Sequence, residues 1–144
     1  MIGTVVDVRA VGWAQRLPVS SGVRAGREWA REHLHLLGWD REAPETADAV
    51  VLAVSELVTN AHVHACSDAE LVLLWDGRCL CLSVHDRSRH LPVPREAGVD
   101  ATGGRGLVLV DAVADHWHAR RRGDGKTVTA CFHPPVSVHG LLDA

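Results

Sequence analysis

Residues 70–86 of the 144-residue chain read ELVLLWDGRCLCLSVHD, and this stretch decides the fold. Two apolar runs, residues 70–75 and 78–86, flank the dipeptide Asp76-Gly77. Asp-Gly between two such runs is a strong signal for a tight hairpin turn in which both central residues take a positive φ. The sequence therefore predicts an antiparallel pair of strands in the middle of the chain.

The second of these strands has two chemically different faces. Side chains alternate across a strand, so one face carries Leu80, Leu82, Val84 and Asp86, and the other carries Cys79, Cys81, Ser83 and His85. The more apolar set is expected to pack against helices. That choice places the Asp86 carboxylate inside the molecule, at the end of a core strand, where it needs a partner. Asp86 could accept a hydrogen bond from the amino group of a purine, or it could cap the turn that follows.

The rest of the chain supplies helices and a second hairpin. Apolar periodicity and turn residues predict a strand at 11–17, helices at about 18–37, 44–65 and 107–114, and strands at 116–122 and 126–132. Two hairpins indicate a mixed, mostly antiparallel sheet, and the three helices can cover one of its faces. The prediction is one α+β domain over residues 1–144, a two-layer α/β sandwich with its core at about 11–133.

Composition narrows the function. Apolar residues make up 47% of the chain, and 15 Lys and Arg stand against 18 Asp and Glu, a net charge of -3. That charge argues against direct nucleic-acid binding, which needs a positive surface. The chain shows neither a long apolar run typical of a membrane span nor a signal peptide. We therefore expect a cytoplasmic protein whose four cysteines stay reduced.

Two short motifs contain residues suited to binding a nucleotide. Glu56 and Asn60 lie four residues apart on the long helix, so their side chains share one face. An Asn carbonyl suits magnesium, and a carboxylate can act as a general base. Further along, the glycines of residues 102–106 precede the helix at 107–114, where backbone N–H groups and the helix dipole favour a phosphate. Taken alone, the Glu56–Asn60 pair is better explained as a solvent-facing Glu with a helix-terminal Asn. A flexible loop would show the same glycine-rich pattern as residues 102–106.

Other patterns do not support a site. Residues 123–127 resemble the end of a Walker A loop, but position 120 is Arg120 rather than glycine and a strand follows. The cysteines and histidines lack the paired C-x-x-C spacing of a structural zinc site, so packed cysteines and surface histidines are the better interpretation.

In this order the motifs resemble those of the histidine-kinase-like ATPases, the GHKL or Bergerat-fold family. Glu56-Leu57-Val58-Thr59-Asn60-Ala61 with His64 resembles their N box. Asp86-Arg87-Ser88 is similar to their G1 box, and Gly104-Arg105-Gly106-Leu107 to their G2 box. The resemblance runs from about residue 17 to 132, nearly the whole chain. The Asp-x-Ser form of the G1 box is similar to that of bacterial anti-sigma-factor serine/threonine kinases.

The resemblance implies a site, residue by residue. Asn60 would bind Mg²⁺, Glu56 would be the catalytic base, and Asp86 would hydrogen-bond the adenine of ATP. Cofactor contacts would also come from Gly104, Arg105, Gly106, Leu107 and Thr127, with residues 89–103 as an ATP lid. Alternation opposes one of these assignments: Thr127 joins Asp86 on the inner face only if Val128, Ala130 and Phe132 face outward or a bulge shifts the register.

The resemblance also implies partners and an activity. The protein would bind a sigma factor, withhold it from RNA polymerase and so regulate transcription. It would also phosphorylate Ser or Thr on a small anti-anti-sigma protein of the STAS type. Two alternatives stay open: an ATP-binding interaction module without phosphotransfer, and an ATPase domain that serves a separate phospho-acceptor protein. A homodimer is a further expectation.

Overall fold

The computed structural model describes residues 10–92 and 101–135, and of residues 101–106 the backbone alone. Five strands form one sheet in the order β1-β2-β3-β5-β4. They are β1 (Val11–Leu17), β2 (Ala69–Trp75), β3 (Leu80–Asp86), β4 (His116–Arg122) and β5 (Gly125–Phe132). All four pairings between these strands are antiparallel, so the sheet that was expected to be mixed is antiparallel throughout the described part.

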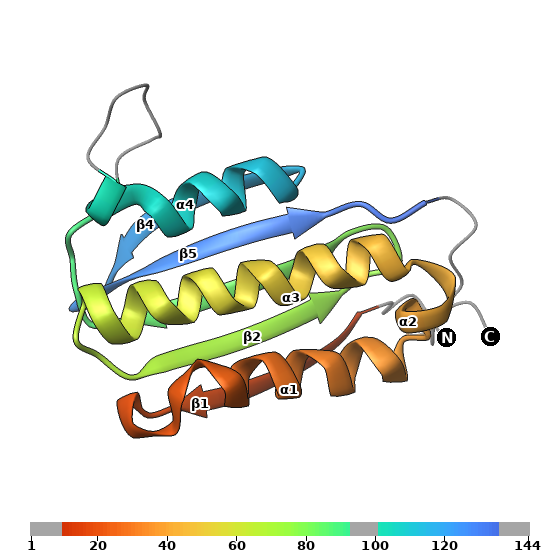
Figure 1. Ribbon diagram of the computed structural model, residues 1–144, viewed down its shortest axis with the longest axis horizontal. Helices are drawn as coiled ribbons and strands as arrows, with labels where there is room; N and C mark the ends of the chain where they lie inside the picture. Colours follow the sequence, from red (N-terminus) through yellow and green to blue (C-terminus); the bar gives the residue numbers. More distant parts are fainter. Residues whose placement is uncertain (1–9, 93–100, 136–144) are drawn as a thin grey trace, which may run out of the picture.

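The helices cover one face of this sheet (Figure 1). They are α1 (Gly22–Leu36), α2 (Trp39–Glu42), α3 (Pro44–Thr59) and α4 (Ala101–Val113), together with the short helical segments η2 (Val19–Ser21) and η3 (Asn60–His64). The two-layer α+β sandwich predicted from the sequence is confirmed. None of the described helices is long and apolar enough to cross a membrane.

The core lies between α3 and the two central strands. Helix α3 packs against α1 on one side and α4 on the other, and it rests on β3 and β5. Its buried side chains recur at helical spacing and include Val50, Val54 and Leu57. The expected inner face of β3 is confirmed, because alternate residues from Leu80 to Asp86 are buried. Helix packing therefore fixes which face of the sheet is closed and leaves the other face open.

The turn between β2 and β3 differs from its prediction. Gly77 has φ 94°, but Asp76 has no positive φ, so the two-residue turn with two left-handed residues is wrong. The Asp76 carboxylate oxygen Oδ1 instead accepts the N–H groups of Arg78 and Cys79, each at 2.9 Å. The side chain thus organises a longer turn that needs one glycine rather than two permissive residues.

Candidate functional site

Glu56 and Asn60 occupy the last turn of α3 and the start of η3. Both side chains are half-buried, and within the described residues neither forms a hydrogen bond or an ion pair. The backbone continues from α3 into a π-helical turn at Asn60, with no break between them. Single π turns are rare and often mark functional sites in α-helices. The structure therefore keeps a carboxylate and an amide together and available on one side of the helix.

Asp86 ends β3 in a buried ion pair with Lys126 of β5. Lys126 Nζ lies 2.8 Å from Oδ2 and 3.1 Å from Oδ1 of Asp86. The two side chains are only 5% and 3% exposed, for Lys126 and Asp86 respectively. The Ser88 N–H also donates to Asp86 Oδ1, at 2.8 Å. The carboxylate therefore caps the following turn, as one interpretation expected, and also neutralises a buried ammonium group.

The partners of Asp86 leave part of its acceptor capacity unused. Two carboxylate oxygens offer about four acceptor positions. Oδ1 accepts from Ser88 and Lys126, whereas Oδ2 accepts from Lys126 alone. One position on Oδ2 can thus still receive an N–H group of a ligand.

A close backbone contact holds the Asp86–Lys126 pair in register. Asp86 lies directly opposite Lys126 in the β3–β5 pairing. At the neighbouring Gly125, an added Cβ would lie 1.8 Å from the Asp86 carbonyl oxygen. Glycine is therefore required here for close approach, and its φ is not positive.

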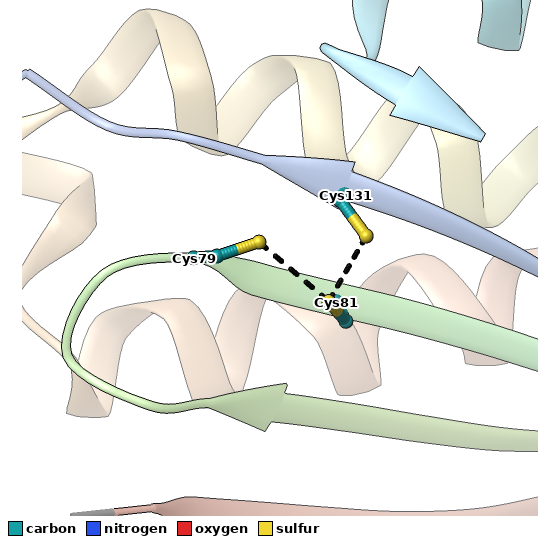
Figure 2. A group of neighbouring side chains, drawn as sticks. All are labelled: Cys79, Cys81 and Cys131. Carbon is teal, nitrogen blue, oxygen red and sulfur yellow. Dashed lines mark hydrogen bonds between the residues drawn. The ribbon is translucent and has the colours of Figure 1, made fainter.

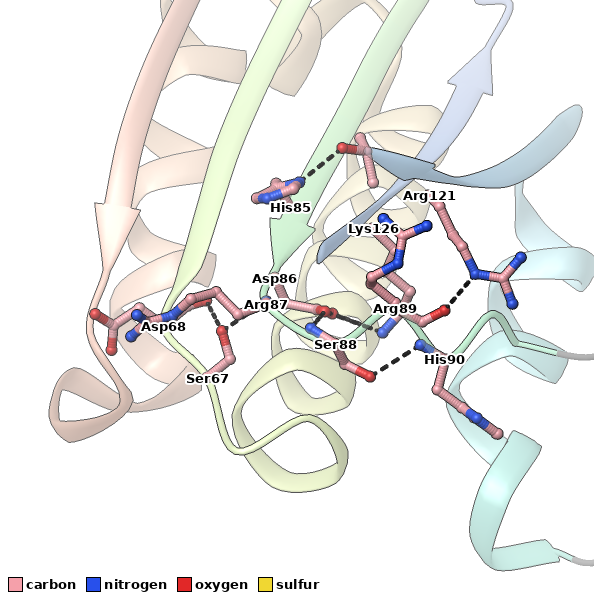
Figure 3. A network of polar contacts seen from close by, with 11 residues as sticks. Ser67, Asp68, His85, Asp86, Arg87, Ser88, Arg89, His90, Arg121 and Lys126 are labelled. Atoms are coloured by element: carbon pink, nitrogen blue, oxygen red, sulfur yellow. Dashed lines mark hydrogen bonds and ion pairs between the residues drawn. The ribbon is translucent and has the colours of Figure 1, made fainter. Parts of the chain in front are cut away.

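Ser67 joins the end of β3 to the end of η3 (Figure 3). The Ser67 hydroxyl accepts the Arg87 N–H at 3.0 Å, and the Ser67 N–H donates to the Ala61 carbonyl at 3.0 Å. Next to it, Asp68 accepts a hydrogen bond from Arg16 at 2.5 Å. The Arg16 guanidinium holds the pKa of the Asp68 carboxyl below its usual range. Asp86 thereby lies beside the helical segment that begins at Asn60.

The start of α4 lies at the same end of the sandwich (Figure 1). At the far end of α4, Asp115 N–H donates to the Cys131 carbonyl, near the end of β5. A helix of 13 residues is about 20 Å long. The first turn of α4 therefore lies toward the Asp86–Lys126 end, as Figure 3 also shows for the teal helix near His90.

The glycine-rich stretch forms helix rather than the loop before it. Helix α4 begins at Ala101, so Gly104 and Gly106 lie within it, and the predicted helix start at residue 107 is wrong. Leu107 is 2% exposed and belongs to the core. The side chain of Arg105 lies outside the described residues. The backbone of the two glycines thus lies at the Asp86–Lys126 end of the molecule, and the Leu107 side chain packs in the core.

Thr127 lies on the opposite face of the sheet from Asp86. It stands across from His85 in the β3–β5 pairing, and its hydroxyl lies 2.9 Å from His85 Nδ1. Both residues line a hollow of about 690 Å³ on the open face. Val128, Ala130 and Phe132 face the core, and the pairing has no bulge. The register that Thr127 needed in order to reach an adenine beside Asp86 is therefore absent, and this assignment is corrected.

The segment after Asp86 is tied to the β4–β5 hairpin before it leaves the described part of the chain. Arg89 donates to the Gly123 carbonyl, and Arg121 donates to the Arg89 carbonyl at 2.9 Å. The Ser88 hydroxyl accepts the His90 N–H at 3.1 Å. The expected lid spans residues 89–103, and its central part, residues 93–100, lies outside the described residues.

Sequence reasoning missed Lys126 as the partner of Asp86. A signal for it was present, because alternation that puts Val128, Ala130 and Phe132 in the core puts Lys126 there too. A buried lysine needs an anionic partner. The nearest inward-facing carboxylate is the one at the end of β3. Ser67 had no comparable signal, since its role depends on the meeting of η3 with the chain after β3.

Comparisons with known proteins agree with this arrangement. The family model described as "Histidine kinase-like ATPase domain" matches residues 20–132. The chain belongs to the histidine-kinase-like ATPase family. Within the matched range lie Glu56, Asn60, Asp86 and the glycines of α4. The family assignment made from the three boxes is thus confirmed, and an ATP-binding domain is what the family implies.

A solved structure shares the fold. A chain in the crystal structure of the SiaB–SiaC complex from Pseudomonas aeruginosa has a TM-score of 0.57 and 12% sequence identity. The similarity covers 90% of this chain and 93% of that one. No curated protein matches the sequence. At this identity the structural neighbour supports the architecture, and residue roles rest on the site itself.

Proposed function

We propose that this protein binds Mg-ATP and acts as a partner-switching protein kinase that controls a sigma factor. The observation that carries the proposal is the gathering of Glu56, Asn60, Asp86 and the glycines of α4 at one end of a histidine-kinase-like ATPase domain. Ser67 joins the segment that follows Asp86 to η3, which begins at Asn60 and continues α3. The nucleotide would therefore sit between the end of α3 and the start of α4.

Glu56 and Asn60 fit the metal and the chemistry. Carboxylate and amide oxygens are the ligand types that Mg²⁺ accepts, and both side chains are unpaired among the described residues. Bound Mg²⁺ neutralises the charge that develops on the phosphates. The Asn60 carbonyl would hold the ion, and Glu56, one turn away, would accept the proton of the attacking hydroxyl.

Asp86 supplies the base-binding end of the site. The free acceptor position on Oδ2 can receive the adenine amino group, while hydrogen bonds from Lys126 and Ser88 hold the carboxylate in its orientation. The backbone N–H groups around Gly104 and Gly106 would face the phosphates, assisted by Arg105. Leu107 contributes by fixing α4 in the core. Thr127 has no part in this site, because its side chain is on the other face.

The proposed partners follow from the family and its type of G1 box. The acceptor would be a Ser or Thr of a small STAS-type antagonist. The sigma factor would be bound in the alternate state by a homodimer of this chain. The structural neighbour is itself described in complex with a second protein, SiaC, which supports a protein partner rather than a small-molecule substrate. Transcription would respond through release of the sigma factor in the cytoplasm.

Calorimetry with Mg-ATP tests the nucleotide site. Asp86→Asn alone leaves the buried Lys126 without a carboxylate, so the informative variant is the double change Asp86→Asn with Lys126→Met. We expect loss of measurable ATP binding, whereas the matched control Asp76→Asn, in the distant β2–β3 turn, keeps the affinity of the unchanged protein. Equal affinity in the double variant would refute the role of Asp86.

A second measurement tests phosphotransfer. With radiolabelled ATP and a cognate antagonist, Glu56→Gln should bind ATP normally but transfer phosphate at least about 100-fold more slowly. Glu45→Gln, at the exposed start of the same helix, is the matched control. Transfer at the unchanged rate in Glu56→Gln would exclude it as the base, and acid-labile label on histidine would point instead to a separate phospho-acceptor pathway.

The alternative that stays open is an ATP-binding interaction module without phosphotransfer. Tight ATP binding with no transfer to any antagonist would support the module over the kinase.

A further inference from the structure

Three cysteines from two distant parts of the sequence meet on the open face of the sheet (Figure 2). Cys81 Sγ lies 3.0 Å from Cys131 Sγ and 3.6 Å from Cys79 Sγ. All three sulfur atoms lie within 4.8 Å of one another. We call Cys79, Cys81 and Cys131 the three-cysteine cluster.

Strand geometry explains why the cluster forms. Cys79 directly precedes β3 and Cys81 is the second residue of that strand, so the two side chains, two residues apart, lie on the same side. Cys81 stands directly opposite Cys131 in the β3–β5 pairing, so the third thiol joins the same face. The sequence pattern C-x-C, with a third cysteine 50 residues later, gives no hint of this without the register.

The cluster is separate from the proposed nucleotide site. Asp86 and Lys126 lie at the other end of the same two strands and face the helices, whereas the cluster faces away from them. Cys79 and Cys81 are part-exposed, so an ion can reach the sulfur atoms from solvent. The inference therefore stands or fails independently of ATP binding.

We propose that the three-cysteine cluster binds one thiophilic d¹⁰ metal ion, zinc(II) or copper(I), through three thiolates. Soft thiolate ligands select these ions. With metal–sulfur bonds of about 2.3 Å, tetrahedral zinc places its sulfur ligands about 3.8 Å apart. The observed separations are 3.0 and 3.6 Å for two of the sulfur pairs and at most 4.8 Å for the third, a range that includes this distance. A disulfide, by contrast, needs about 2.05 Å, and all three cysteines are free thiols.

Binding must displace protons from the thiols. Burial raises the pKa of Cys79 and of Cys81 to about 11, and it also raises the pKa of Cys131. At neutral pH the empty cluster is therefore protonated. Each thiol that becomes a ligand releases one proton to the buffer, so three protons leave as one ion binds, and no oxidant or reductant is consumed.

The test is a competition titration of the reduced full-length protein under anaerobic conditions. Zinc(II) is supplied against a chromogenic zinc chelator in one arm, and copper(I) against a copper(I)-selective chelator in the other. We expect one ion per chain in at least one arm, with about three protons released per ion in lightly buffered solution. The arm with the tighter binding identifies the ion.

Variants connect the binding to these residues. Cys81→Ser removes the central sulfur and should weaken binding at least about 100-fold, and Cys79→Ser, at a more open position, serves if the first variant does not fold. Cys66→Ser is the matched control, because Cys66 is an exposed free thiol outside the cluster. Absence of 1:1 binding in both arms overturns the proposal. So does binding that survives both cluster substitutions or is lost in Cys66→Ser.

Discussion

Removing the charge of Lys126 should destabilise the protein far more than removing a surface charge. Lys126→Met keeps an unbranched side chain of similar length and deletes the ammonium group. It leaves the carboxylate of Asp86 buried, 3% exposed, with the Ser88 N–H as its remaining hydrogen-bond donor among the described residues. The energetic consequence is that of an uncompensated buried charge.

The magnitude follows from burial and geometry. Breaking a buried, hydrogen-bonded ion pair by removing one partner costs about 3–5 kcal/mol, whereas an exposed pair contributes about 0–1 kcal/mol. The two bonds of Lys126 Nζ, at 2.8 and 3.1 Å, place this pair in the first class. A domain is stable by only about 5–15 kcal/mol, so the loss is a large share of the total.

Restoring charge balance should recover much of the loss. Asp86→Asn added to Lys126→Met removes the second charge and keeps an acceptor for the Ser88 N–H. Because neither side chain then carries a buried charge, the double variant should regain at least about 2 kcal/mol relative to Lys126→Met. A double-variant loss smaller than the sum of the two single-variant losses would show that Asp86 and Lys126 stabilise the fold as a pair. Two independent packing contributions would instead add.

Urea unfolding followed by tryptophan fluorescence measures these differences. With a slope of about 1–3 kcal/mol per molar urea, Lys126→Met should lower the midpoint by about 1 M or more. Arg24→Met is the control, because the Arg24–Glu28 pair is highly exposed, and its cost should stay below about 1 kcal/mol. A loss for Lys126→Met no larger than that of the control, or additive losses in the double variant, would refute the reasoning.

Three further predictions concern other parts of the molecule. Gly125→Ala should cost about 3 kcal/mol or more in urea unfolding, because its Cβ would overlap the Asp86 carbonyl oxygen; a neutral result would contradict the close contact. The hydrogen bond from Arg16 lowers the pKa of the Asp68 carboxyl, so Asp68 contributes stability that is fully present above its unfolded pKa and is lost as pH falls through the lowered folded pKa. Asp68→Asn should flatten that acid-side decline in thermal unfolding. At pH 8 iodoacetamide should label Cys66 well before the three-cysteine cluster, whose thiols have a raised pKa, and mass spectrometry should show the difference narrowing toward pH 11.

The strands were predictable because their signal is short-range. The strands at residues 11–17 and 116–122 match β1 and β4, and the alternation in β3 correctly placed Asp86 inside. Alternation of apolar and polar residues indicates both that a segment is a strand and which of its side chains face the core. The proximity of Glu56 and Asn60 was predictable for a similar reason, since a spacing of four on a long amphipathic helix places two side chains on one face.

The failures share a different cause, namely tertiary context. The glycines of residues 103–106 predicted a loop because glycine is a poor helix former, yet α4 starts at Ala101 and packs against α3. Thr127 was assigned from the family resemblance, but the residue of β5 that stands opposite Asp86 is Lys126. The cysteines were judged on their spacing along the chain, which gives no sign that Cys79, Cys81 and Cys131 lie close together in space. Each of these features depends on how segments that are distant in the sequence pack against one another.

The register of β3 against β5 is the feature on which both proposed sites depend. Because side chains alternate with a period of two, a slip of one residue would turn Asp86 outward and carry Cys81 into the core. Two interactions oppose that slip at one end of the pair: the buried Asp86–Lys126 contact and the backbone approach at Gly125. At the other end, Cys81 faces Cys131. A metal ion held there would tie the same two strands together. The pairing that positions the Asp86 carboxylate on one face of the sheet therefore also aligns the thiols on the other face.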